Sequence, residues 1–208
     1  DVFSPSPVQH TERLLQAMMV NFHLERFTMD VKMAYTNAPL PPGERIAVVY
    51  PDGFKRRHPE TGEELFLVLE KNLYGMPSAA RGWGQHRDQF ILKRFNEAGW
   101  RVTRSLMDPC LFVIDKLPAG YTGAPRAAKH EDAVEAGLQL ESTIEDVTEL
   151  EQSGIERTWM LIHTDDCDCY GTNLDVVKEI NDILNQKWTT EVVDSSYVLG
   201  VKRTLVRD

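Results

Sequence analysis

The sequence of 208 residues lacks several features that would define its class. It has no run of about 18 apolar residues, so we expect no membrane-spanning helix. Its three cysteines, Cys110, Cys167 and Cys169, are too few for the disulfide framework of a small secreted domain. Its first residues have neither the basic nor the apolar region of a secretory signal peptide. These absences predict an intracellular protein, cytoplasmic or nuclear, that is not secreted.

An initiator methionine and an excess of basic charge are also absent. The missing methionine predicts a processed product or a fragment of a longer polyprotein. Acidic residues outnumber Lys and Arg by 32 to 23, which gives a net charge of −9. Nine of the acids lie in residues 131–156, where no Lys or Arg occurs, so the rest of the chain is balanced. Bulk charge therefore gives no support for nucleic-acid binding, which would have to depend on a local site.

Apolar periodicity predicts an α+β fold, in which helices back a mostly antiparallel sheet. The spacing of apolar residues predicts helices over 11–23, with Thr11 as N-cap, 78–97 and 173–188. Residues 45–50 and 64–69 are expected to pair as a hairpin with a basic tip at 55–58. The other predicted strands are 27–31, 110–114, 159–163, 167–170 and 197–201.

The segment 115–157 separates two predicted strands by 43 residues, far more than an ordinary hairpin loop contains. Its first half is rich in Pro, Gly and Ala, and its second half is acidic. We therefore interpret it as an acidic insertion or linker outside the core. This divides the chain into three regions, namely 1–114, the insertion 115–157, and 158–208.

Two adjacent carboxylates, Asp165 and Asp166, follow the apolar strand that ends at His163. They repel each other, and a solvated turn is the ordinary explanation for such a pair. A divalent cation between the carboxylates and phosphate oxygens would remove the repulsion, and Mg²⁺ commonly takes one or two protein carboxylates. Asp30, at the end of a predicted strand, is the candidate third carboxylate of a two-metal site for nucleotidyl transfer.

Six segments of the chain resemble, in order and spacing, the motifs of copia-like retrotransposon reverse transcriptases. In the first of them, Asp30 is followed five positions later by the aromatic Tyr35, and the fifth corresponds to the family's YVDD box. The segments are MDVKMAY (29–35), PDGF (51–54), LYGMPSAARGW (73–83), DPCLF (108–112), HTDD (163–166) and YVLGV (197–201).

The resemblance implies a right-hand polymerase palm with partial fingers: 1–114 would hold the partial fingers and the first half of the palm, and 158–208 its second half. It implies that Asp30, Asp165 and Asp166 are the catalytic residues and bind two Mg²⁺ ions, which Mn²⁺ could replace. The implied partners are dNTPs and an RNA or DNA template–primer.

The remaining roles are also implied by the resemblance. Nucleotide contacts would come from Tyr35, whose ring would exclude a ribose 2′-hydroxyl, together with Val31, Tyr74 and Gly75. Primer contacts would come from His163, Leu199 and Gly200, the last two in a tight hairpin. Lys32 is expected either near the triphosphate or simply in solvent. The chain departs from the family near Glu191, where the family usually carries a lysine.

A second hypothesis is a retrotransposon-derived, non-catalytic subunit with a structural or interaction role in a larger protein assembly. It is motivated by the lack of basic charge and by the end of the chain just after the last motif. Full function of an Asp30→Ala/Asp165→Ala variant and stable protein partners would support it. A palm-fold cyclase or another nucleotidyltransferase ranks last, because it needs neither Tyr35 nor a primer-binding strand.

Overall fold

The computed structural model describes residues 4–121, 153–193, 197–198 and 201–202. The chain forms two compact units. One consists mainly of Met33–Asp88, and the other of Pro5–Lys32 with the described residues from Gln89 onward. No helix in these described ranges is long and apolar enough to cross a membrane.

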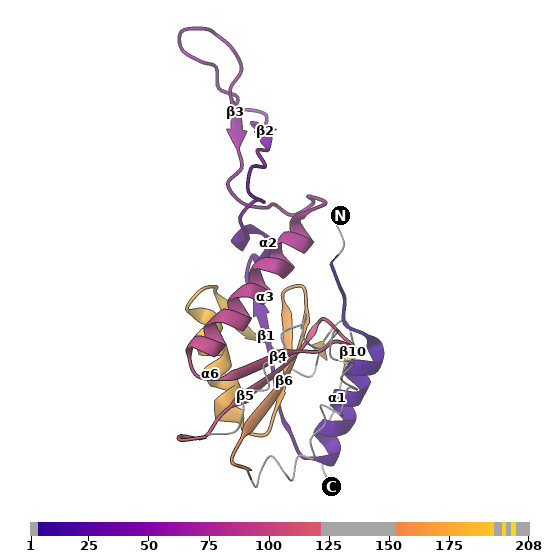
Figure 1. The fold of residues 1–208 in the computed structure, drawn as a ribbon. Helices are drawn as coiled ribbons and strands as arrows, with labels where there is room; N and C mark the ends of the chain where they lie inside the picture. The colour runs from indigo at the N-terminus through magenta and orange to yellow at the C-terminus, as the bar shows by residue number, and fades with distance from the viewer. Residues whose placement is uncertain (1–3, 122–152, 194–196, 199–200, 203–208) are drawn as a thin grey trace. The chain divides into compact units, whose positions relative to one another are not determined.

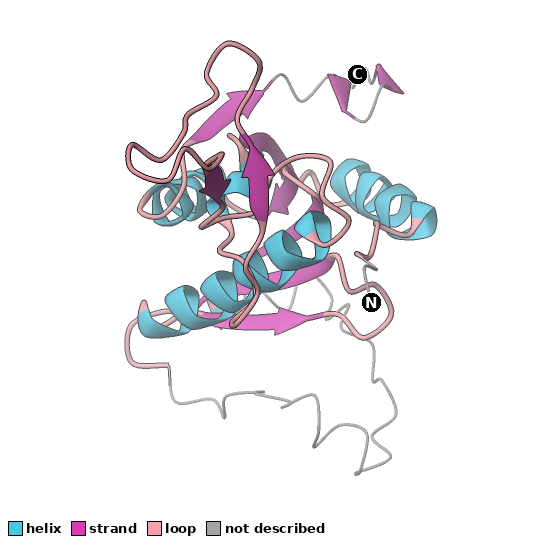
Figure 2. Ribbon diagram, turned by 90° about the horizontal axis from the view of Figure 1, so that it is seen from above, coloured by secondary structure: helices cyan, strands magenta, loops and turns pink. Residues whose placement is uncertain are grey.

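The larger unit contains a six-stranded sheet with the strand order β4-β5-β6-β7-β1-β8. Every neighbouring pair of strands is antiparallel, as the sequence predicted. The strands are drawn as arrows in Figure 1, and Figure 2 distinguishes helices in cyan from strands in magenta. The strands are β1 (Glu25–Val31), β4 (Arg101–Arg104), β5 (Leu111–Lys116), β6 (Glu156–His163), β7 (Asp166–Gly171) and β8 (Thr190–Val193).

Helices cover both faces of this sheet, and Figure 1 shows α1 and α6 on opposite sides of it. Leu15 and Met18 of α1 (Gln9–Asn21) share a buried cluster with Trp159 of β6 and Tyr170 of β7. Successive residues of a strand point to opposite faces of the sheet. The residues next to Trp159 along β6 and next to Tyr170 along β7 therefore face α6 (Leu174–Asn185). The sheet is therefore buried on both sides over most of its length.

The central strands and helices follow the succession β1–α3–β6–β7–α6–β8, where α3 is Ala79–Glu97. This is a β–α–β–β–α–β unit, in which β1 lies between β7 and β8. The part of α3 that belongs to the larger unit packs against the segment that follows α6, as the contact of the Phe90 and Trp188 rings shows, with centroids 4.6 Å apart. Strands β4 and β5 extend the sheet on the far side of β6.

The smaller unit contains α2 (Ala34–Asn37), the start of α3, and the hairpin of β2 (Ala47–Val49) and β3 (Phe66–Val68). The hairpin is antiparallel, which confirms the predicted pairing. Buried Asn72 donates hydrogen bonds to the carbonyl oxygens of Ala38 (3.2 Å) and Pro39 (2.9 Å), so it joins the two segments that lead into and out of the hairpin.

Several local predictions were wrong. Helix α1 begins two residues before Thr11, and its N-cap is Val8. Strands β4 and β8 were not predicted, because both are short edge strands with polar residues, and they form through pairing with distant segments. The predicted strand 197–201 is two short strands, β9 (Tyr197–Val198) and β10 (Val201–Lys202), paired antiparallel.

The predicted insertion lies largely outside the described residues, since 122–152 are not among them. At its two ends, β5 continues through Asp115 and Lys116, and β6 already includes Glu156 and Arg157. Asp115 accepts buried hydrogen bonds from Arg157 (2.7 Å) and from Arg101 of β4 (2.8 Å). Both ends of the predicted insertion are therefore part of the sheet.

The sheet and α6 approach each other closely at Gly171. A Cβ atom there would lie 2.6 Å from Cγ2 of Val177 and 3.0 Å from Oγ1 of Thr158. We expect Gly171→Ala to lower the free energy of unfolding by about 1–3 kcal/mol, as measured by urea denaturation, because the helix must move away. Gly84→Ala is the control, since a Cβ at this α3 position has no neighbour closer than 3.9 Å. Equal stability of the two variants would contradict this close packing.

Candidate active site

Four polar side chains form a row across one end of the sheet. Asp166 of β7 lies directly opposite His163 of β6 on one side and Asp30 of β1 on the other. Asp30 in turn lies opposite Glu191 of β8. Opposed residues of antiparallel strands point to the same face with Cβ atoms about 4.5–5.5 Å apart. The sheet therefore brings together residues that are more than 130 positions apart in the chain.

The turn between β6 and β7 adds Asp165 to this row. Thr164 has a φ of 56°, a left-handed conformation that is uncommon for a β-branched residue. The backbone carbonyl of Asp165 accepts a hydrogen bond from the N–H of Val31 at 3.0 Å. This bond fixes the turn against the end of β1, so the backbone itself sets the position of Asp165 relative to Asp30.

Burial, and after it the repulsion between like charges, raises the pKa of both Asp165 and Asp166. Burial raises the pKa of Asp165, and the charge of Asp30 raises it further. Burial also raises the pKa of Asp166, with additional contributions from Asp165 and Asp30. His163 opposes both shifts. The three predicted catalytic carboxylates are therefore close enough to affect one another, as a shared cation site requires.

Lys32 provides positive charge at the other end of the row. Its Nζ atom lies 3.4 Å from Oδ2 of Asp30 and forms an ion pair with Glu191. Glu191 and, after it, Asp30 raise the pKa of Lys32. No role for Glu191 was predicted from the sequence, because its place opposite Asp30 depends on the pairing of β1 with β8.

A buried ionic cluster lies on the same face of the sheet as the row. It begins at the next pair of β1 and β7 residues on that face, Thr28 and Asp168. The carboxylate of Asp168 accepts hydrogen bonds from Arg26 (2.9 and 2.8 Å), Thr28 (2.9 Å) and the hydroxyl of Tyr170 (2.7 Å). Burial and the charge of Asp168 raise the pKa of Tyr170. The sequence analysis missed this cluster, because its pairings appear only when the register of β1 and β7 is known.

The carboxylates fit a hard divalent cation in donor chemistry. All are oxygen donors, and the ammonium group of Lys32 already occupies a cation position beside Asp30. In the described part of the chain, however, no group of three or more His, Cys, Asp and Glu side chains is arranged to hold a metal ion as it stands.

The predicted nucleotide-binding residues divide between the two units. Val31 lies beside Asp30 with its side chain buried, so only its backbone is available there. Tyr35 and Tyr74 belong to the smaller unit, where their ring centroids are 4.7 Å apart. Gly75, next to Tyr74, has a φ of 87°, which glycine adopts without strain. Leu199 and Gly200 lie outside the described residues, although β9 and β10 pair on either side of them.

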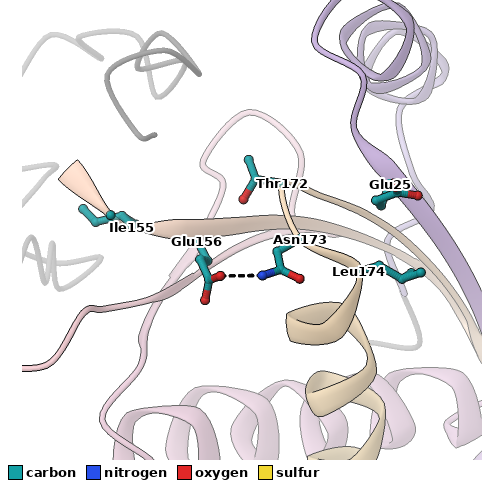
Figure 3. A pocket seen from close by; sticks show the side chains of 7 residues that line it. Glu25, Ile155, Glu156, Thr172, Asn173 and Leu174 are labelled. Carbon is teal, nitrogen blue, oxygen red and sulfur yellow. Dashed lines mark hydrogen bonds between the residues drawn. The ribbon is translucent and has the colours of Figure 1, made fainter. Parts of the chain in front are cut away.

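A pocket lies at the opposite end of the same strands (Figure 3). Its lining includes Glu25 at the start of β1, Glu156 at the start of β6, and Thr172 and Asn173 just after β7. Asn173 donates a hydrogen bond to Glu156 within it, shown as a dashed line. This pocket is separated from the carboxylate row by the length of the strands and is not part of the candidate site.

Removal of one repelling charge should stabilise the metal-free protein. A carboxyl group whose pKa is higher in the folded than in the unfolded chain destabilises the fold above its unfolded pKa of about 4. Asp166→Asn should therefore raise Tm by roughly 1–3 °C at pH 7 in EDTA, a modest effect because the group is partly exposed. The difference from the unsubstituted protein should shrink as the pH falls towards about 4.

The matched control is Asp182→Asn, an exposed acid on α6, the helix that packs against the other face of the sheet. Thermal unfolding followed by circular dichroism at several pH values measures both variants. A lower Tm for Asp166→Asn at pH 7 would contradict the repulsion.

Comparison of the chain with models of protein families, with curated protein sequences and with solved structures finds no match.

Proposed function

We propose that the chain forms the palm of a retrotransposon-type RNA-directed DNA polymerase and uses two metal ions for nucleotidyl transfer from dNTPs. The observation that carries the proposal is the register of β1 and β7, which sets Asp30 opposite Asp166 with Asp165 in the adjoining turn. These are the three acids that the sequence resemblance selects. Asp30 is distant in sequence from Asp165 and Asp166, so its convergence with them is independent of the motif match.

The strand order supports the same proposal. The β–α–β–β–α–β unit places the hairpin of β6 and β7 beside β1, so the acids lie at one end of adjacent central strands. One face of the sheet is packed against α6, as the close approach of Gly171 and Val177 shows. The carboxylate row lies on the other face, where the side chains of Asp30 and Lys32 remain partly exposed.

Each residue of the row would have a defined task. Asp30, Asp165 and Asp166 would hold the Mg²⁺ ions, which on binding would supply the acidification of a primer 3′-hydroxyl and the neutralisation of a triphosphate. His163 lies beside Asp166 on β6 and would offer its ring to the primer. In the smaller unit, the ring of Tyr35 contacts that of Tyr74, and the sequence resemblance would give Tyr35 the task of disfavouring a 2′-hydroxyl.

The test is incorporation of dTTP on a poly(rA)·oligo(dT) primer–template by the natural polypeptide that contains this sequence. Incorporation that requires Mg²⁺ or Mn²⁺ and stops with EDTA supports the proposal. Binding of Mn²⁺ to the 208-residue chain, measured by electron paramagnetic resonance, tests the cation site separately. Absence of both incorporation and Mn²⁺ binding would overturn the proposal.

A further inference from the structure

Lys32 occupies an unusual place for a lysine next to a candidate cation site. Its backbone N–H donates to the carbonyl of Thr189 at 2.9 Å, which fixes the base of its side chain beside β8. From there its ammonium group reaches both Asp30 and Glu191. A positive charge at 3.4 Å from Asp30 already neutralises part of the carboxylate charge that a metal ion would neutralise.

The three side chains are accessible enough to exchange partners. The side chains of Lys32, Asp30 and Glu191 are 47%, 25% and 59% exposed. Asp30 and Glu191 are direct neighbours across β1 and β8, so the ammonium group can move from one to the other by rotation of its flexible stem. Asp165 and Asp166 lie on the far side of Asp30 from Glu191.

We propose that Lys32 is a built-in counter-ion that competes with the divalent cation for Asp30, and that Glu191 weakens this competition by holding the ammonium group. The inference rests on the proposed function, because it concerns the same cation site. A metal ion on Asp30 would repel Lys32 from that carboxylate, while Lys32 keeps its existing ion pair with Glu191. Glu191 is then a positioning residue that acts through Lys32, and is not itself a ligand.

The proposal predicts opposite effects of two single substitutions on the dissociation constant of Mn²⁺, measured by electron paramagnetic resonance on the 208-residue chain at low salt. Lys32→Met should tighten binding about two- to fivefold, the range expected for an exposed ion pair. Glu191→Gln should weaken binding about two- to fivefold, because Lys32 is left with Asp30 as its carboxylate partner. The double variant should bind like Lys32→Met alone.

The double variant distinguishes the proposal from direct ligation by Glu191. If Glu191→Gln still weakens binding when Lys32 is methionine, Glu191 is a ligand and the proposal is overturned. The controls are Lys178→Met and Glu179→Gln on α6, which carry the same charge changes on exposed side chains elsewhere. Equal effects of the control and test substitutions would show a general charge effect and would also overturn it.

Failure of this inference is distinguishable from failure of the proposed function. If Mn²⁺ binds and Asp165→Asn abolishes that binding, while Lys32→Met leaves the dissociation constant unchanged, only the counter-ion role is wrong. If no Mn²⁺ binding depends on Asp165, the cation site and the counter-ion role are both wrong. Circular dichroism of each variant confirms that the folded structure is retained.

Discussion

Asp165→Asn is expected to lower the rate of Mg²⁺-dependent dNTP incorporation by at least about 10³-fold, the scale expected when a two-metal site loses a ligand. Asparagine has nearly the same shape as aspartate but no negative charge, so it cannot neutralise a bound cation. The backbone bond from Val31 to the Asp165 carbonyl does not involve the side chain, and the turn should remain in place. Single-turnover incorporation on poly(rA)·oligo(dT) measures the effect, with Asp182→Asn as the exposed control.

The carboxylates should act as one unit in this assay. An Asp30→Asn/Asp165→Asn variant should therefore be scarcely slower than Asp165→Asn alone, because the first substitution already disables the site. Incorporation by Asp165→Asn at the unsubstituted rate would contradict the two-metal proposal. Such a result, together with full function of an Asp30→Ala/Asp165→Ala variant in a larger assembly, would support the non-catalytic subunit instead.

Asp168→Asn is expected to lower the free energy of unfolding by about 3–5 kcal/mol, because it leaves a buried guanidinium without its counter-charge. The side chains of Arg26 and Asp168 are 10% and 7% exposed, and they form a bidentate pair. Burial lowers the pKa of Arg26, but the hydrogen bond and charge of Asp168 outweigh it, so the pKa is raised overall. A guanidinium is not deprotonated in proteins even without such a partner, so Arg26 remains charged in the variant and the cost falls on the folded state.

Urea denaturation of Asp168→Asn beside Glu179→Gln tests this prediction. Glu179 forms an exposed pair with Lys116, so its substitution should cost less than about 1 kcal/mol. Combining Asp168→Asn with Arg26→Met should cost less than the sum of the single effects, because neither charge is then stranded. Equal stability of Asp168→Asn and Glu179→Gln would show that the cluster does not stabilise the sheet.

The sequence was sufficient to predict those helices and strands that depend on local patterns of apolar residues. The apolar run from Trp159 to Ile162 correctly predicted a buried strand, and the spacing of apolar residues correctly predicted the helices α1, α3 and α6, apart from the start of α1. The antiparallel α+β class followed from this order of helices and strands. The polymerase palm, its catalytic role and its cofactors stay predictions, since the comparisons with known proteins find no match.

The electrostatic details could not be predicted from local patterns. Lys32 and Glu191 are brought together by the pairing of β1 with β8, and Arg26 reaches Asp168 through the pairing of β1 with β7. A shift of register by one residue would send each side chain to the other face. This register cannot be predicted from local patterns, because the paired residues lie more than 130 positions apart in the sequence.

The hydrogen bond between the Val31 N–H and the Asp165 carbonyl has a practical consequence for structural work. Since this main-chain bond holds the turn that carries Asp165 against the end of β1, a charge-neutral variant should preserve the shape of the site while halting any turnover. The Asp165→Asn protein would then bind a hybrid duplex without turnover, so that the structure of the complex could be determined.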